Sequence, residues 1–362
     1  MERKLRVGII GCGGIANNKH MKALAKINEV EMVAFCDIVE ERAQKAAKEF
    51  GIREARHYID YNKLLAENKL DVVHVCTPNN SHDFITIAAL EAGCHVMCEK
   101  PMAKTVEGAK QMLEASKRTG KKLTIGYQNR FRQDSIYLKR ACDRGDLGEI
   151  YFAKAHALRR RAVPTWGVFL KEEEQGGGPL IDIGTHALDL TLWMMNNYKA
   201  KSVVGSKYSK LRYDTETGNA FGDWNPEEFT VEDAAFGFIT MEDGATVIVE
   251  SSWALNTLEV GEAQTTLCGT KSGADMKDGL RINGTEFGKL YVKKPEMGLG
   301  GVAFFVGEGI DEEDAEAMSW IDCIINNTEP VVKPEEALVV TEILTAIYKS
   351  AETGQAIYFN GM

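Results

Sequence analysis

Residues 5–37 of the chain read LRVGIIGCGGIANNKHMKALAKINEVEMVAFCD. The apolar, β-branched run at 5–10 predicts a strand, the glycines predict a turn, and the Ala-, Lys- and Leu-containing stretch after them predicts a helix. A second apolar run, 30–36, predicts another strand and is followed by Asp37. Strand, glycine turn, helix, strand and acid in this order are typical of a dinucleotide-binding βαβ unit.

Each part of this unit has a physical task. Gly11 makes the tight turn, Gly13 lets the backbone approach a pyrophosphate, and the small Ala16 lets helix and strand pack. The pyrophosphate lies at the helix N-terminus, where unpaired N–H groups and the helix dipole favour an anion. Asp37, about 20 residues further on, can accept hydrogen bonds from both ribose hydroxyls. GxGxxA alone also occurs in other glycine-rich turns, but together with the strand, spacing and acid it predicts a nucleotide site.

The composition limits the kinds of binding partner that we expect for this protein. A length of 362 residues favours about two domains. A net charge of −10 without a dense Lys/Arg block argues against nucleic acid and anionic membranes. No apolar run approaches the ~18 residues that span a bilayer, and the basic start resembles a signal peptide but lacks a small-residue cleavage site. We therefore expect a cytoplasmic protein.

The eight cysteines do not form a metal-binding pattern. Cys94 and Cys98 are close in sequence, but a second pair is lacking and His95 would share their strand. We expect reduced, buried thiols and no metal site.

Strands and helices continue to alternate up to about residue 126. Predicted helices cover 40–50, 60–68, a stretch ending at 92, and 105–118, and predicted strands cover 71–76, 94–98 and 122–127. This alternation predicts a Rossmann-type domain at 1–126, with a doubly wound parallel sheet. Ligands of such sheets bind beyond the carboxyl ends of the strands. One cofactor could therefore touch Thr77-Pro78-Asn79, Glu99-Lys100-Pro101 and Tyr127-Gln128-Asn129, which follow three of them.

Strands dominate the rest of the chain, which we expect to form a second α/β domain at 127–362 with a large open, mostly antiparallel sheet. The expected elements are a helix at 134–143, strands at 150–160, 201–211, 234–241 and 245–253, and a closing helix at 334–353 that packs back. The last two strands form a hairpin that is apolar on both faces. Helices can cover one face and another subunit the other, so we expect a homo-oligomer. Residues 276–310 are glycine-rich and permit no assignment.

The most unusual stretch is QGGGPLIDIGTH at 175–186. Pro179 suits the first turn of a helix, and Asp182 and His186, four residues apart, share a face of it. The glycines would let a ligand approach the backbone. An acid and an imidazole there could orient a substrate hydroxyl and take its proton. The alternative is a solvated polar stripe, which Asp189 would continue, and the spacing alone does not exclude it.

Four motifs occur in the order and spacing of one enzyme family. They are GCGGIA at 11–16, CTPN at 76–79, EKP at 99–101, and GG at 177–178 followed by Asp182 and His186. Over essentially its whole length, the chain resembles the glucose–fructose oxidoreductase/inositol dehydrogenase/MocA family of nicotinamide-dependent sugar oxidoreductases. The resemblance implies a nucleotide domain, an α/β domain whose open sheet makes oligomer contacts, and a site of Lys100, Asp182 and His186 against the nicotinamide.

A closer resemblance concerns Arg159-Arg160-Arg161, Pro164-Thr165-Trp166-Gly167 and the glycine run. These segments are similar to bacterial glycoside dehydrogenases that oxidise the sugar C3 hydroxyl, some of which open the removal of plant C-glycosides. The chemistry then expected is NAD-dependent oxidation of a secondary hydroxyl of a pyranose or its glycoside. Hydride goes to nicotinamide C4 while a base removes the hydroxyl proton.

The roles of the three catalytic candidates follow from their chemistry. His186 is favoured as the base because the reference pKa of an imidazole, ~6.5, lies near working pH. Lys100 would donate to the same oxygen, and Asp182 would hold His186 or a sugar hydroxyl. The inverse, with Lys100 as base and His186 as orienter, stays open.

The expected contacts follow from the motifs and the resemblance together. Those to NAD are Gly11, Gly13, Gly14, Ile15, Asp37, Thr77, Pro78, Asn79, His82, Glu99, Lys100, Gln128 and Trp166. Those to the sugar are Lys100, Tyr127, Arg159, Trp166, Asp182 and His186. Trp166 could stack on a sugar, wall off the nicotinamide or pack in the interior.

Three other functions are compatible with parts of this sequence. An inositol or other polyol dehydrogenase and an NAD-dependent redox-elimination glycosidase would keep the same fold and site. An NAD-binding regulator without turnover is disfavoured, because it would not need Lys100, Asp182 and His186 together.

Overall fold

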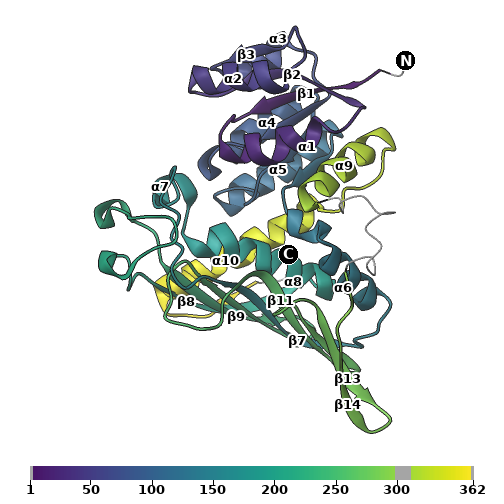
Figure 1. The fold of residues 1–362 in the computed structure, drawn as a ribbon, viewed down its shortest axis with the longest axis vertical. Helices are drawn as coiled ribbons and strands as arrows, with labels where there is room; N and C mark the ends of the chain where they lie inside the picture. The colour runs from purple at the N-terminus through teal and green to yellow at the C-terminus, as the bar shows by residue number, and fades with distance from the viewer. Residues whose placement is uncertain (1–2, 298–310, 360–362) are drawn as a thin grey trace. The chain divides into compact units, whose positions relative to one another are not determined.

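The computed structural model describes residues 3–297 and 311–359, which form two compact units (Figure 1). The first unit contains residues 3–128 and 311–338, and the second contains 129–297 and 339–359. The sequence predicted a single boundary near residue 126. The difference arises because the chain returns to the first unit after residue 310, where a further helix packs into its core.

The first unit is built on a six-stranded parallel sheet in the order β3-β2-β1-β4-β5-β6, as predicted for a doubly wound Rossmann fold. Its strands are β1 (Leu5–Ile10), β2 (Val30–Cys36), β3 (Arg56–Tyr58), β4 (Val72–Val75), β5 (His95–Cys98) and β6 (Leu123–Ile125). Its helices are η1 (Ala16–His20), which continues as α1 (Met21–Leu24), then α2 (Glu40–Phe50), α3 (Tyr61–Glu67), η2 (Asn79–Ser81), α4 (His82–Glu91) and α5 (Val106–Thr119).

Helix α9 (Glu312–Ile325) completes the core of this unit. Its buried residues Ala317, Trp320 and Ile321 join the apolar cluster that contains Val7 and Ile9 of β1. Figure 1 shows α9 beside α1. This helix is not among those predicted from the sequence, although Asp311 caps it by accepting from the N–H of Asp314.

The second unit contains a nine-stranded sheet in the order β14-β13-β12-β11-β7-β10-β9-β8-β15. Only β7 and β10 pair in parallel, so the sheet is mixed and mostly antiparallel. The strands are β7 (Ile150–Leu158), β8 (Ala200–Tyr208), β9 (Ala234–Met241), β10 (Thr246–Ser252), β11 (Gly261–Gly269), β12 (Ser272–Asp275), β13 (Arg281–Glu286), β14 (Lys289–Lys293) and β15 (Ile357–Tyr358). Strands β13 and β14 lie in the segment left without an assignment, of which 298–310 is outside the described residues.

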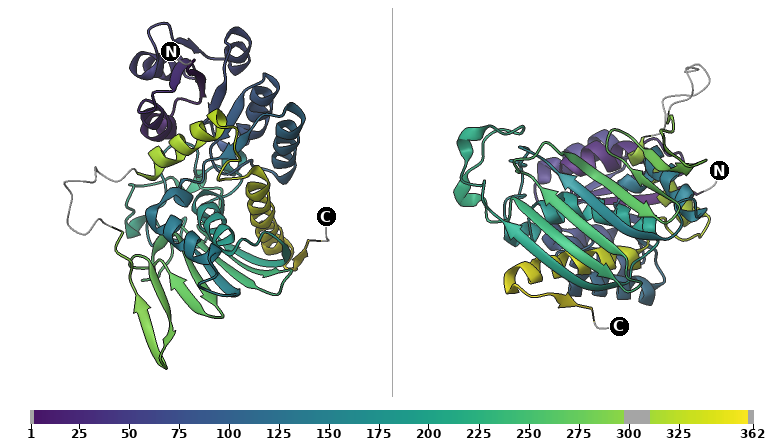
Figure 2. Two further views of the ribbon diagram at one scale, coloured as in Figure 1. Left: turned by 90° about the vertical axis from the view of Figure 1, so that its right-hand side faces the viewer. Right: turned by 90° about the horizontal axis from the view of Figure 1, so that it is seen from below.

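Helices cover one face of this sheet. The helical elements are η3 (Gln128–Phe131), α6 (Gln133–Asp143), α7 (Glu172–Gln175), η4 (Leu180–Gly184), α8 (Thr185–Met195), η5 (Thr215–Thr217), η6 (Pro226–Glu228) and α10 (Pro334–Thr353), whose first residues belong to the first unit. A Cβ at Gly205 or Gly237 would lie 2.5 Å from an atom of Ile347, so glycines on β8 and β9 let α10 approach closely. Among the described residues, no helix covers the opposite face, as the right view in Figure 2 shows.

The β9–β10 hairpin has two apolar faces, as predicted. Ile239, Val247 and Val249 are buried beneath the helices. On the open face, Phe238 is paired with Val204 of β8 on one side and Ile248 of β10 on the other. Phe238 is 49% exposed, so this face carries an apolar row without a cover within the described chain.

Candidate active site

The glycine turn after β1 is shaped for an anion. A Cβ at Gly11, whose φ is 89°, would lie 2.6 Å from the carbonyl carbon and oxygen of Cys76, so only glycine fits. Nothing lies within 4 Å of the Cβ positions of Gly13 and Gly14. A helical segment starts at Gly14, with Ile15 partly exposed. The backbone at the start of this helix therefore faces open space, which fits the pyrophosphate of a dinucleotide.

Asp37 is held at the end of β2 by the same turn. Its Oδ2 accepts from the N–H of Cys12 at 2.8 Å, and its Oδ1 accepts from the N–H of Val39 at 2.9 Å. Each carboxylate oxygen has a further lone pair for a ribose hydroxyl. Ile38 beside it is 91% exposed and uncharged. These residues fit the ribose of NAD and offer no cation for a 2′-phosphate.

His82 joins two of the predicted strand-end loops. It is fully buried, with Nδ1 2.8 Å from the carbonyl oxygen of Pro101 and Nε2 2.8 Å from that of Thr77. Ser81 Oγ also donates to Thr77 Oγ1. In this conformation His82 lies behind the loops and positions them, while Thr77 remains partly accessible. Pro78 and Asn79 lie at the start of η2 in the same loop.

A buried ionic cluster lies beside the Glu99-Lys100-Pro101 segment. Lys19 Nζ is 2.8 Å from Glu99 Oε1 and 2.8 Å from Oε2 of Glu316 on α9, and it donates to Gln128 Oε1 at 3.3 Å. The side chains of Lys19, Glu99 and Glu316 are all at most 6% exposed. Lys19 and Glu316 were not predicted from the sequence, because they are almost 300 residues apart and no motif links them.

Charge and burial shift the pKa values of the two carboxyl groups in this cluster in opposite directions. Burial raises the pKa of Glu99, but Lys19 and His20 outweigh it and hold that pKa well below its usual value. Burial raises the pKa of Glu316 to about 7, although Lys19 opposes the rise. Glu99 is therefore the stable anion of the cluster, and Glu316 takes up a proton near neutral pH.

Two histidines extend the cluster into the core. His20 Nε2 is 2.8 Å from Glu99 Oε1, and its Nδ1 is 2.9 Å from Nδ1 of His74. Burial lowers the pKa of both rings. With His20 neutral and Nε2–H donating to Glu99, its Nδ1 accepts from His74. This assignment leaves His74 Nε2 unprotonated, in agreement with its having no partner among the described residues.

Lys100 follows Glu99 at the end of β5. Its backbone N–H donates to Glu99 Oε2 at 3.1 Å, so the carboxylate that binds Lys19 and His20 also fixes the turn that presents Lys100. The lysine side chain is partly exposed. Tyr127, predicted to line the sugar site, is fully buried, whereas Gln128 is partly exposed.

In the second unit, Asp182 and His186 differ from their helical neighbours in exposure. Along Leu180–Leu192 they are the two residues that are not buried. Asp189 does not continue a solvated stripe, because it is buried and accepts two hydrogen bonds from Arg130, at 2.9 and 2.6 Å. The polar-stripe interpretation is therefore wrong for Asp189. Between Leu180 and Leu192, an acid and an imidazole are therefore the residues that keep accessible surface.

Close packing explains why glycines precede this helix. A Cβ at Gly177 would lie 2.1 Å from Tyr348 Oη, and one at Gly178 would lie 2.3 Å from the carbonyl oxygen of Glu232. The interpretation of these two glycines as a bare surface for a ligand is therefore wrong. The buried Glu232 accepts from the N–H groups of Gly178 and Leu180 at 2.9 and 3.2 Å and from Tyr348 Oη at 2.7 Å. These bonds anchor the start of the helix that carries Asp182 and His186.

Asp182 interacts with Trp253 and with the charge of Arg159. Trp253 Nε1 donates to Asp182 Oδ2 at 3.1 Å. Arg159 forms two hydrogen bonds with Glu262, at 2.6 and 2.8 Å. Burial lowers the pKa of Arg159, but Glu262, with a further contribution from the charge of Asp182, outweighs it and raises that pKa. Trp166, predicted to contact sugar or cofactor, is 52% exposed and so is not an interior residue.

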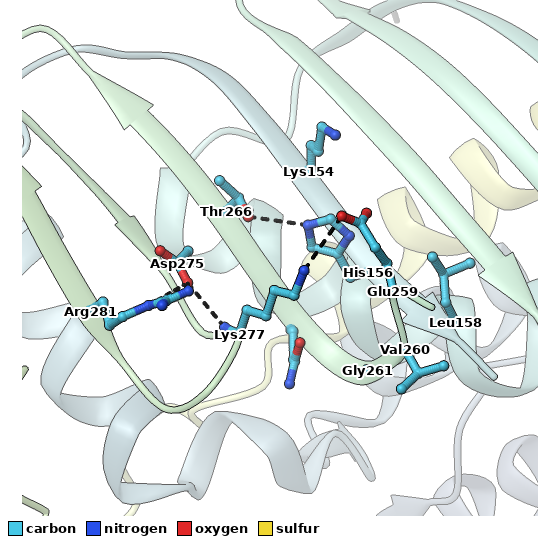
Figure 3. Close-up of a pocket in the computed structure, with 11 residues that line it drawn as sticks. Lys154, His156, Leu158, Glu259, Val260, Gly261, Thr266, Asp275, Lys277 and Arg281 are labelled. Atoms are coloured by element: carbon cyan, nitrogen blue, oxygen red, sulfur yellow. Dashed lines mark hydrogen bonds and ion pairs between the residues drawn. The ribbon is translucent and has the colours of Figure 1, made fainter. Parts of the chain in front are cut away.

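A separate pocket of about 310 Å³ lies on the open face of the second sheet (Figure 3). It is lined by Lys154, His156, Leu158, Glu259, Val260, Gly261, Gln264, Thr266, Asp275, Lys277 and Arg281. Most of its charges are paired within the unit: Arg281 with Asp275 at 2.7 Å and Lys277 with Glu259 at 3.4 Å. None of the predicted catalytic residues lines it.

The described part of the chain comprises residues 3–297 and 311–359. Within these ranges, no cluster of three or more His, Cys, Asp or Glu side chains is arranged to hold a metal ion. None of the helices described there is both long and apolar enough to cross a membrane.

Comparison with known proteins agrees with this geometry. A family model described as an oxidoreductase family with an NAD-binding Rossmann fold matches residues 5–127, and the GFO/IDH/MocA C-terminal domain model matches 136–275. D-glucoside 3-dehydrogenase of Escherichia coli K12 is 36% identical over 98% of this chain and 97% of its own length. Inositol 2-dehydrogenase of Salmonella typhimurium LT2 is 32% identical over 57% of this chain and 60% of its own.

A solved structure shares the fold. The crystal structure of an oxidoreductase domain protein from Kribbella flavida aligns with a TM-score of 0.86 at 23% identity, covering 99% of this chain and 100% of that one. The two domain models together match most of the chain, and one relative matches it over nearly its full length. This chain belongs to the GFO/IDH/MocA family of NAD-binding oxidoreductases.

Proposed function

We propose that this protein is an NAD-dependent dehydrogenase that oxidises a secondary hydroxyl, at C3, of a glucoside or related pyranose. The observation that carries the proposal is the exposure pattern of Leu180–Leu192, where Asp182 and His186 are the accessible side chains. The full-length relative at 36% identity, a D-glucoside 3-dehydrogenase, supports the substrate class. The glycine turn and Asp37 support NAD.

In the proposed reaction, bound NAD supplies the carbon that accepts the hydride. His186 accepts the hydroxyl proton as general base. Lys100, fixed through Glu99, donates a hydrogen bond to the same oxygen and stabilises its developing negative charge. Asp182, oriented by Trp253, holds His186 or a neighbouring sugar hydroxyl. The eight free thiols support a reducing, cytoplasmic location.

A panel of glucosides, free pyranoses and inositols, screened with NAD for the appearance of NADH absorbance, tests this function. Oxidation of glucosides with one NADH formed per product is the expected result. Oxidation of inositols alone would favour the polyol dehydrogenase. Release of the aglycone without net NADH would favour redox elimination, and binding of NAD without any turnover would favour a regulator.

Cofactor choice depends on Asp37. Its carboxylate repels a 2′-phosphate, so kcat/KM should be higher with NAD than with NADP. Asp37→Ala should reduce NAD affinity by about tenfold to a hundredfold, since a hydrogen bond to a charged group is worth about 1.5–3 kcal/mol. Adding Ile38→Arg should then raise NADP affinity, with Ile38→Ala as control. Equal kcat/KM for both cofactors in the unaltered enzyme would contradict this assignment.

The apolar row on the open sheet face is proposed as a contact between subunits in a homo-oligomer. Phe238→Asp places a charge between Val204 and Ile248 and should dissociate the assembly. Light scattering at micromolar concentration measures the mass. Phe287→Asp is the matched control, because Phe287 is 97% exposed in the β13–β14 turn and lies outside this row. A monomeric unaltered protein would exclude the proposed contact.

A further inference from the structure

A line of aromatic rings leads from Asp182 to the surface of the second unit. Trp253, which donates to Asp182, is fully buried. The ring centroid of Phe169 lies 6.5 Å from that of Trp253 and 5.8 Å from that of Trp166. The centroid of Phe221 lies 4.8 Å from that of Trp166. These four residues, which we call the aromatic wall, connect a candidate catalytic acid with solvent.

The outer end of the wall is open to a ligand. Trp166 and Phe221 are 52% and 43% exposed. Their rings meet edge to face, with an interplanar angle of 88°, and Trp166 meets Phe169 at 72°. Because about half of each side chain is exposed, part of both rings is available to a further planar or apolar group.

Hydrogen bonds connect the loop that carries Trp166 to the loop that carries Phe221. Asn219 Oδ1 accepts from the N–H of Val163 at 2.8 Å, and Asn219 Nδ2 donates to the carbonyl oxygen of Val163 at 2.9 Å. The N–H of Ala220 donates to the carbonyl oxygen of Arg161 at 3.1 Å. Trp166 and Phe221 are therefore held in place before a ligand arrives, which lowers the entropic cost of binding.

Arg159 adds a fixed cation to the outer end. Its guanidinium carbon lies 5.9 Å from the ring centroid of Phe221, and Glu262 holds the group through two hydrogen bonds. The hydrogen bonds to Glu262 and to the Ala162 carbonyl oxygen fix the plane of the Arg159 guanidinium beside Phe221. Two aromatic rings and a guanidinium plane together are suited to an aromatic group.

We propose that Trp166, Phe221 and Arg159 form a subsite for the aromatic aglycone of a glycoside whose sugar binds at Asp182 and His186. This proposal rests on the proposed function and specifies its substrate class. The occupant is a part of the substrate because the wall is continuous with the candidate catalytic acid through Trp253. The apolar row of the sheet, Val204, Phe238 and Ile248, lies on different elements, and we assign the subunit contact to that row.

The test compares phenyl glucoside with methyl glucoside of the same anomeric configuration. In the unaltered enzyme kcat/KM should be higher for the phenyl compound, mainly through a lower KM. Trp166→Ala and Phe221→Ala should each lower the phenyl-to-methyl ratio by about threefold to tenfold, as expected for the loss of one aromatic pair. Phe287→Ala, which removes an exposed phenylalanine at the β13–β14 turn, should leave the ratio unchanged.

Calorimetric binding to the full-length protein mixed with NADH separates this proposal from the proposed function. Tighter binding of phenyl than of methyl glucoside, lost in Trp166→Ala, supports the subsite even if neither compound is oxidised. Equal phenyl-to-methyl ratios in the unaltered protein and both variants would overturn it. A change of mass in Trp166→Ala and Phe221→Ala, measured by light scattering, with unchanged ratios would also overturn it and reassign the rings to a subunit contact.

Discussion

His186→Ala is expected to lower kcat by about 10²–10⁴, because that is the usual loss when a positioned general base is removed. NAD affinity should change little, since the residues that fit the pyrophosphate and ribose belong to the glycine turn and Asp37. Stopped-flow or steady-state NADH formation measures kcat, and a separate fluorescence titration measures NAD affinity. His156→Ala is the matched control, because this histidine lies in the same unit and pairs with Glu250.

Lys100→Met should lower kcat on the same scale, and the two substitutions should not be additive if both residues act on one hydroxyl group. Asp182→Asn should cost less if Asp182 only orients His186, and should mainly raise KM if it binds a sugar hydroxyl. A kcat for His186→Ala within about threefold of the unaltered enzyme would exclude general-base catalysis by His186. Lys100 would then be the base. Near-full activity of both single variants would refute the shared site.

Much of the first unit could be predicted from the sequence because its signals are local. Strand runs, turn glycines and helix caps lie within a few residues of one another, and Asp37 follows the glycine turn at the spacing that a βαβ unit imposes. Asp37 indeed binds back to that turn through the N–H of Cys12. The strand-end loops were also found, because parallel strands bring their carboxyl ends to one edge.

Contacts between segments that are distant in the sequence could not be predicted. Glu316 reaches Lys19 from a helix almost 300 residues away, and no spacing rule links them. The glycines at 177–178 were predicted to let a ligand approach, but Tyr348 and Glu232 occupy the space beside them. Asp189 shares the helical spacing of Asp182 and His186 but turns inward to Arg130. Helical periodicity predicts which residues share a face of the helix. Which of these residues are exposed to solvent depends on how the helix packs against the rest of the unit.

Lys19 is the shared cation of the buried cluster beside Lys100, where it pairs with Glu99 and Glu316. Lys19→Met should lower the free energy of unfolding by about 3–5 kcal/mol, the usual cost of removing one partner from a buried ion pair. The substitution leaves Glu99 and Glu316 buried without their shared cation. Urea unfolding measures the loss. Lys26→Met is the matched control, because Lys26 pairs with Asp314 of the same helix α9 but is half exposed, and exposed pairs contribute little.

Glu316→Gln should cost less than Lys19→Met, because Lys19 and Glu99 remain a balanced pair. Its effect should depend on pH with a definite sign. The pKa of Glu316 is raised from 4.5 to about 7, so the folded protein binds a proton that the unfolded chain releases in this range. Stability from this group is therefore fully present below about pH 4.5 and is lost as the pH rises through 7. Glu316→Gln should flatten that part of the stability profile.

The double variant Lys19→Met/Glu316→Gln decides whether charge is the cause. It removes the cation and one of the two carboxylates, so a single buried anion remains, and His20 can donate to it. If uncompensated charge accounts for the loss, the double variant should be more stable than Lys19→Met alone at a pH high enough to ionise Glu316, although it lacks more of the native contacts. Equal or lower stability of the double variant would mean that Lys19 contributes through the packing of its side chain. In that case Lys19→Met should also leave the orientation of Lys100, and hence kcat, unchanged, because Glu99 would keep its bond to the Lys100 amide without help from Lys19.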